Sequence, residues 1–212
     1  MSLQNRVNPF GNIIATPERG AWTGNRGVIH NEQQQIMKHH AVNYWITCVL
    51  EYKGKRRPLM TPKRWTELFF LDEATAFAAG HRPCGFCRYP AYKKFKALWL
   101  QAHAATYGLK SDTSIQIIDA LIHKERLGAN NMQQTFTATL QQLPSGVLVK
   151  QPQEPHAYLW WQGQFYQWSF GGYQPTKKVD PLQTVHVLTP RSYVEVFRLG
   201  YVPQVDASVG QR

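Results

Sequence analysis

Cysteines, acidic side chains and long apolar runs are all scarce in this chain of 212 residues. Its three cysteines cannot all pair with one another, so the sequence excludes a disulfide framework, and a chain of this length can bury a core without one. The longest apolar runs, such as residues 157–161, are far shorter than the roughly 20 residues of a membrane helix, which excludes a membrane-spanning protein. The first residues lack the apolar region of a secretory signal. We therefore expect a cytoplasmic protein with reduced thiols.

Because acidic residues are few, the chain is strongly basic: 24 lysines and arginines against 13 acids leave a net charge of +11. Residues 1–110 hold 16 basic and 6 acidic side chains, whereas residues 111–212 hold 8 and 7. The excess therefore belongs to the first half. A polyanion is the usual partner of such an excess, although lysines that serve only solubility would give the same total.

The hydrophobic pattern of the first half mixes strands with helices. Alternating apolar residues from 43 to 52 predict a strand that carries Cys48, and a glycine-containing turn predicts a hairpin with residues 56–60. A short buried strand over 68–71 precedes a predicted helix over 73–79. A longer amphipathic helix is expected after the last cysteine.

The second half is predicted to be mainly β. One helix is expected between residues 112 and 127, and the pattern changes to strands from residue 135. A hairpin is predicted between 158–161 and 164–168, and a last helix after residue 190. The aromatic residues that crowd this half could stack on bases, but we expect most of them in the core of a sheet.

The strongest local motif is Cys84-Gly85-Phe86-Cys87, directly before a predicted helix. Zinc is commonly bound in this way, because the tight turn aims both sulfurs at one point. A redox dithiol has the same spacing but follows a strand in a βαβ unit, and two ordinary buried cysteines are the remaining alternative. Cys48 is the only other thiol and is the predicted third ligand.

A tetrahedral zinc site needs a fourth ligand, and histidine is the expected type. His30 is the first choice, because residues 27–30 resemble a short strand that could lie beside the strand of Cys48. His81, close before the motif in the sequence, is the main rival. His39 and His40 are a third option.

Residues 70–88 resemble the second half of the zinc domain of the Ada methylphosphotriester repair proteins. The shared features are a phenylalanine, an alanine-rich helix and the run Ala78-Ala79-Gly80-His81-Arg82-Pro83-Cys84-Gly85-Phe86-Cys87, followed by Arg88. The resemblance covers under a tenth of the chain. It implies that Cys84 and Cys87 bind zinc and that the basic surface around them meets DNA phosphate.

The sequence also departs from that family. Members bind zinc through four cysteines and transfer a methyl group from DNA to one of the first pair, yet only Cys48 stands upstream here. Nothing matches the family's regulator or alkylguanine transferase parts, and residues 111–212 match no part of it.

Basic side chains cluster just after Cys48 and around the Cys84–Cys87 motif. Such a cluster can straddle a phosphate backbone, although a solvated basic hairpin would have the same composition. The predicted nucleic-acid contacts are Lys53, Lys55, Arg56, Arg57, Arg64, Arg82, Arg88 and Lys93.

We therefore predict an α+β protein with a zinc-stapled basic unit over residues 1–110, containing a hairpin and short helices. A helix and a mainly β part over residues 111–212 would pack against it. The expected function is binding of nucleic acid, DNA first, in repair or restriction of modified DNA, with Zn²⁺ in a structural role. A metal-dependent nuclease of ββα type and a zinc-stabilised protein-interaction module are the alternatives.

Overall fold

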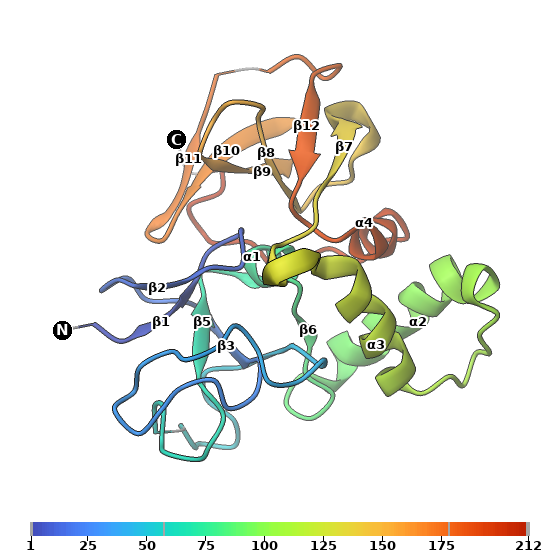
Figure 1. The fold of residues 1–212 in the computed structure, drawn as a ribbon. Coiled ribbons are helices and arrows are strands. Elements are labelled where there is room, and N and C mark those ends of the chain that lie inside the picture. Colours follow the sequence, from blue (N-terminus) through green and yellow to red (C-terminus); the bar gives the residue numbers. More distant parts are fainter. Residues whose placement is uncertain (1, 57, 178, 211–212) are drawn as a thin grey trace.

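The structure is a computed structural model that describes residues 2–56, 58–177 and 179–210. Within these residues the chain forms two six-stranded sheets joined by helices, which confirms the α+β class. Figure 1 shows the second sheet at the top, the first sheet at the lower left, and helices α2 and α3 at the lower right.

The first sheet is built from the N-terminal residues in the order β2-β1-β5-β3-β4-β6. The pairs β1–β5 and β4–β6 are parallel, and the other neighbours are antiparallel. Its strands are β1 (Gln4–Val7), β2 (Ile13–Ala15), β3 (Trp22–Asn25), β4 (Ile46–Cys48), β5 (Leu68–Phe70) and β6 (Arg82–Pro83).

The second sheet has the order β11-β10-β9-β8-β12-β7, and all of its neighbours are antiparallel. The predicted hairpin is the pair β9–β10, in which Trp161 lies opposite Gln164. The strands are β7 (Phe136–Thr139), β8 (Val147–Lys150), β9 (Ala157–Trp161), β10 (Gln164–Ser169), β11 (Gly172–Pro175) and β12 (Thr184–Val187).

Helices lie between and after the sheets. They are α1 (Glu73–Ala78), α2 (Tyr89–Tyr107), α3 (Ile115–Arg126) and α4 (Arg191–Arg198), with the 3₁₀ turns η1 (Ala129–Asn131) and η2 (Leu140–Gln142). The Asp72 side chain caps α1 by accepting the Thr75 N–H, as expected for an acidic N-cap. None of the helices in the described part of the chain has the length and apolar character to cross a membrane.

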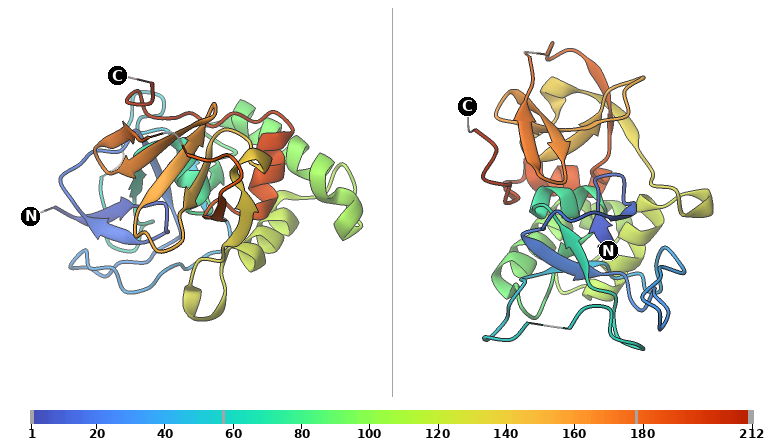
Figure 2. Two further views of the ribbon diagram at one scale, coloured as in Figure 1. Left: turned by 90° about the horizontal axis from the view of Figure 1, so that it is seen from above. Right: turned by 90° about the vertical axis from the view of Figure 1, so that its left-hand side faces the viewer.

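Helix α1 joins the two halves of the molecule, and the right-hand view in Figure 2 shows it between the sheets. Ala74 and Ala78 pack with Leu148 and Leu159 of the second sheet, whereas Ala76 faces the core of the first. Phe77 is fully buried in a third cluster with the aromatic face of α2 and residues of α4. The cores of the two halves therefore meet at this short helix.

Among the described residues after Cys48, which leave out residue 57, the predicted hairpin with residues 56–60 does not form. Strand β4 is three residues long and is hydrogen-bonded on both sides, to β3 and to β6, so neither edge is left for a return strand. Between β4 and β5 the described residues Lys53, Met60 and Lys63 have positive φ values of 53°, 47° and 61°, which a strand does not tolerate. The basic segment is therefore a loop with one isolated bridge, between Tyr52 and Lys55.

Candidate metal centre

A parallel pairing of two very short strands brings the cysteines together. Cys48 ends β4, and the register of β4 with β6 places Thr47 opposite Pro83. One residue further along, Cys48 meets Cys84, whose N–H donates to the Thr47 carbonyl over 2.9 Å. Cys87 follows in the turn that leads into α2. Segments far apart in the sequence thus deliver three thiols to one point.

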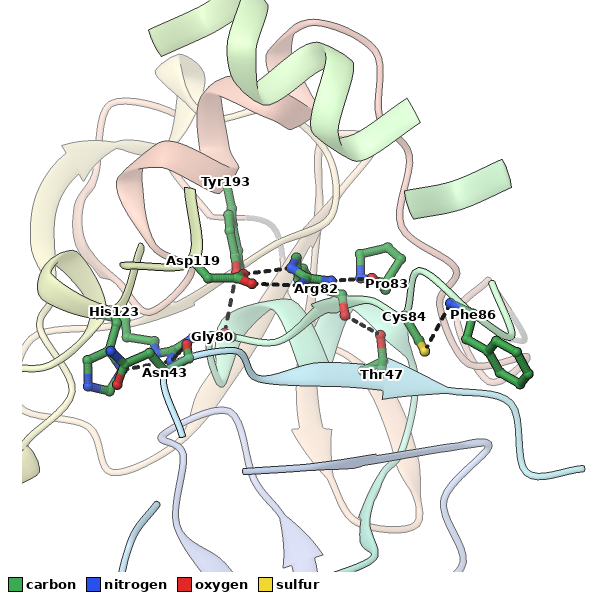
Figure 3. A network of polar contacts seen from close by, with 11 residues as sticks. Asn43, Thr47, Gly80, Arg82, Pro83, Cys84, Phe86, Asp119, His123 and Tyr193 are labelled. Carbon is green, nitrogen blue, oxygen red and sulfur yellow. Dashed lines mark hydrogen bonds and ion pairs between the residues drawn. The ribbon is translucent and has the colours of Figure 1, made fainter. Parts of the chain in front are cut away.

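The sulfur atoms of Cys48, Cys84 and Cys87 lie within 4.8 Å of one another, and all three cysteines are free. Among the residues that the structure describes, no other group of three or more His, Cys, Asp or Glu side chains has its ligand atoms this close together. The Phe86 N–H also donates to Cys84 Sγ over 3.4 Å, an interaction drawn in Figure 3. This group of thiols could hold a metal ion.

The pKa values of the three thiols depend on one another, because the thiols are in contact. Contact with Cys48 lowers the pKa of Cys84 to about 2, and contact with Cys84 raises the pKa of Cys48 far above its usual value. Without a cation the cluster therefore favours a single thiolate, since further deprotonation would place like charges in contact. A divalent cation removes that repulsion, because a thiol that coordinates a metal is deprotonated outright.

Three sulfurs account for three of the four positions of a tetrahedral site. Within residues 2–56, 58–177 and 179–210, no fourth His, Cys, Asp or Glu comes within 4.8 Å of all three. A small cavity of about 50 Å³ adjoins the centre, and Cys48 and Cys87 line it together with Lys55, Trp65 and Glu67. Three protein ligands beside a cavity are typical of a metal site whose fourth position takes water or an incoming group.

His30, the first choice for a fourth ligand, lies outside the cysteine group, which corrects the sequence-based prediction. Its Nδ1 is 2.6 Å from Thr66 Oγ1, and its Nε2 is 3.3 Å from the Thr61 carbonyl oxygen. The residue of β3 that faces Cys48 is Thr23, and the chain has left the sheet before it reaches His30. Both ring nitrogens therefore contact residues of the loop that follows β4, and neither contacts the cysteines.

The rival histidines gather at a different place, around the buried Trp45. Ring centroids of His39, His40 and His81 lie 5.4, 5.7 and 5.2 Å from that of Trp45. His81 is close to Cys84 in sequence, but its fully buried ring packs against Phe70 at 4.6 Å. None of the three joins the cysteine group.

Arg82 is not a nucleic-acid contact, contrary to the prediction. Its guanidinium is buried and donates to both oxygens of the buried Asp119 of α3, over 2.7 and 2.6 Å (Figure 3). Although burial works against the charge, the hydrogen bonds and charge of Asp119 raise the pKa of Arg82. The pair fixes β6, and with it Cys84, to α3.

Arg88 is also internal, so this second prediction is wrong for the same reason. It forms an ion pair with the buried Glu73, donates to Thr47 Oγ1 over 2.8 Å, and lies 3.9 Å from the ring of Trp22. The Tyr201 hydroxyl donates to the same carboxylate over 2.8 Å. With these partners the Arg88 guanidinium fixes the turn that carries Cys84 and Cys87, and it is not available to bind a phosphate.

The other predicted basic contacts that the structure describes are exposed: Lys53, Lys55, Arg56, Arg64 and Lys93. Arg56 forms an exposed ion pair with Glu51 over 3.1 Å. Arg57 falls outside the described residues.

Sequence reasoning missed the aromatic residues that accompany these charges. Phe86, inside the cysteine turn, has 68% of its surface exposed, and its ring centroid is 5.0 Å from that of Tyr52. Lys53 lies over the Tyr52 ring, and Lys93 lies over the exposed ring of Tyr89. The sequence could have predicted that Phe86 is exposed, because a residue in a tight turn between two metal ligands has little room to turn inward. We call Tyr52, Lys53, Lys55, Phe86, Tyr89 and Lys93 the basic–aromatic surface.

Comparison with protein-family models, with curated proteins and with solved structures finds no match for this chain. The resemblance of residues 70–88 to the Ada zinc domain therefore stays a prediction.

Proposed function

We propose that this chain binds Zn²⁺ through Cys48, Cys84 and Cys87 and uses the basic–aromatic surface beside that centre to bind DNA. The observation that carries the proposal is the contact between Tyr52 and Phe86, because it joins the basic loop to the cysteine turn. Tyr52 and Lys53 of the basic loop thereby lie beside Phe86 of the cysteine turn.

Zinc is the metal that the ligand set favours. Thiolates are soft ligands, and tetrahedral sites rich in cysteine sulfur are typical of zinc or iron–sulfur centres. Three thiolates around one Zn²⁺ leave a net charge of −1. Lys55, which lines the adjoining cavity, offers a positive charge close to that site.

DNA is the polyanion that this surface suits. Lysines that neutralise phosphates supply sequence-independent affinity, and exposed aromatic rings stack on unpaired bases. A cleft of about 500 Å³, lined by Lys63 and Arg64, shares Trp65 and Glu67 with the cavity beside the thiols. Single-stranded or distorted DNA would use both kinds of contact at once.

A nuclease would need a separate divalent ion held by acids or histidines. The cysteine trio is the only group of three or more metal-ligating side chains found among the described residues, and His30 is engaged by threonines. Binding without cleavage is therefore the function that the geometry supports best.

The proposal is tested by measuring the affinity for fluorescent single-stranded DNA at several salt concentrations. Each lysine that contacts a phosphate adds about 0.7–0.9 to the slope of log affinity against log salt. We expect the variant Lys53→Ala/Lys55→Ala to bind more weakly and to lose between one and two units of slope. The matched control Lys110→Ala/Lys124→Ala removes the same charge from exposed positions outside the surface.

Equal slopes for the two double variants would contradict the proposal, because the basic–aromatic surface would then contribute only to the net charge. Cleavage of the DNA with Mg²⁺ or Mn²⁺ would favour the nuclease instead. Absence of any salt-dependent binding would favour the protein-interaction module.

A further inference from the structure

A second polar centre surrounds Trp45 and contains none of the three cysteines. The guanidinium carbons of Arg26 and Arg126 lie 4.1 and 3.7 Å from the Trp45 ring. Arg26 is fully buried, and only 3% of Arg126 is exposed. Two cations from distant parts of the sequence are therefore held against one ring inside the protein.

Neither arginine has a carboxylate partner among the ion pairs of the described residues. Arg126 donates to the carbonyls of Gly80 and Asn43, over 2.8 and 2.6 Å, and Arg26 donates to the Gly11 carbonyl over 2.9 Å. The charge of Asp119 acts on Arg126, but Asp119 already forms an ion pair with Arg82. Burial lowers the pKa of both arginines. The charge of Arg126 lowers the pKa of Arg26 further, and the charge of Arg82 lowers that of Arg126.

Hydrogen-bond donors remain free in this centre. Arg26 Nη2 and Arg126 Nε are buried and have no acceptor within the described structure. An unpaired buried charge or donor is costly, so a protein that retains two of them gains from a bound anion. A cation is disfavoured here, because the arginines repel it and because the surrounding histidines do not form a group of metal ligands.

A small recess reaches Arg126 but not Arg26, which lies behind the Gly11 side of its wall. Arg126, His39, Trp45 and Gly11 line a recess of about 10 Å³, enough for about one oxygen-sized group. Arg26 Nη2 lies against Gly11, where it would be 3.7 Å from an added Cβ. The recess shares His39 and other lining residues with an open cleft of about 630 Å³ between the two halves of the chain.

The lining of the cleft suits an anionic ligand of moderate size. Lys150 and His186 from the second sheet face it together with Asn12, Asn130 and Asn131, and no acidic residue lines either the cleft or the recess. Its volume falls within the range of small-molecule sites, which often lie between packed units. Lys150 in the cleft and Arg126 in the adjoining recess are the two positively charged side chains of this lining.

We propose that this cleft binds a phosphate group, which Lys150 faces from the second sheet and Arg126 faces from the recess. Guanidinium donors fit the geometry of an oxyanion, and a doubly charged phosphate offsets the unpaired cations better than a single carboxylate does. The site is separate from the cysteine centre and does not depend on the proposed function.

The test uses the full chain and inorganic phosphate as the probe. Phosphate is titrated against potassium chloride of equal ionic strength while the melting temperature is recorded, and the affinity is then measured by calorimetry. A ligand that binds only the folded state raises the melting temperature, and we expect a rise of about 5–11 °C at a hundredfold excess over its Kd. Lys150→Ala should weaken phosphate binding about tenfold, whereas Lys124→Ala, an exposed lysine of α3 outside the cleft, should not.

Arg126→Lys gives a second readout, since it keeps a positive charge but removes the Nε donor, and it should weaken phosphate binding by a similar factor. If that variant fails to fold, the Lys150 comparison still decides. A short oligonucleotide with a 5′-phosphate that displaces inorganic phosphate, while its 5′-hydroxyl form does not, would identify the source as a nucleic-acid end. Displacement by neither would point to a small phosphorylated molecule. The proposal is overturned if phosphate and chloride have equal effects, or if Lys150→Ala and Lys124→Ala bind phosphate alike.

Discussion

Replacing Asp119 by asparagine removes one negative charge from the Arg82–Asp119 pair and leaves the side-chain shape almost unchanged. Both residues are about 5% exposed, and Arg82 donates to the two Asp119 oxygens over 2.7 and 2.6 Å. Removing one partner of a buried pair leaves the other charge buried without compensation, which typically lowers the free energy of unfolding by about 3–5 kcal/mol. For a chain of this size that loss lowers the melting temperature by about 6–20 °C.

The assay is equilibrium unfolding in urea at pH 7, with the exposed pair as the control. Glu51→Gln breaks the Arg56–Glu51 pair, whose side chains are 79% and 49% exposed, and should cost less than about 1 kcal/mol. The double variant Arg82→Met/Asp119→Leu removes both buried charges and should recover most of the loss. The reasoning is refuted if Asp119→Asn costs no more than Glu51→Gln, or if the double variant is as unstable as the single one.

Three further predictions follow from particular contacts. Phe86→Ala should lower the affinity for single-stranded DNA by about 1–3 kcal/mol, and an unchanged affinity in a fluorescence titration would remove the ring from the binding surface. Gly24→Ala should destabilise the first sheet and reduce bound metal, because the new Cβ would lie 2.2 Å from the Ile46 carbonyl oxygen; Gly128→Ala, whose Cβ meets only ordinary contacts, is the control. Burial raises the pKa of Asp72 to about 6 against the opposing hydrogen bonds from Thr75, so the folded state holds the proton more tightly than the unfolded chain. The stability advantage of the wild type over Asp72→Asn should therefore fall, by up to about 3 kcal/mol, as the pH rises from 4 to 7, and urea unfolding that shows no such trend would contradict this assignment.

Much of the local structure was predictable from the sequence. The caps and period of α1 and the amphipathic pattern of α2 depend on near neighbours in the chain, and the hairpin of β9 and β10 depends on a short turn. The spacing of Cys84 and Cys87 likewise identified two members of the thiol group. These features are encoded within a few residues of one another.

The rest depends on contacts between distant segments. Strand β6 is two residues long and contains a proline, so no pattern predicts that it pairs with β4 and places Cys84 beside Cys48. The burial of Arg82 and Arg88 requires acids from other elements, Asp119 and Glu73, whose positions a charge count does not reveal. Composition identified the basic half correctly but could not separate the internal arginines from the exposed lysines.

The gathering of histidines at Trp45 is a further example. His39, His40 and His81 are attractive metal ligands as isolated residues. In the fold they lie around Trp45 together with Arg26 and Arg126, whose positive charges would repel a cation.

The central claim is a metal ion held by three cysteines, and metal content measures it most directly. Elemental analysis of the purified protein should find about one zinc per chain in the wild type and in His30→Ala, and much less in Cys48→Ser. A wild type without zinc, or a loss of zinc in His30→Ala equal to that in Cys48→Ser, would contradict the account.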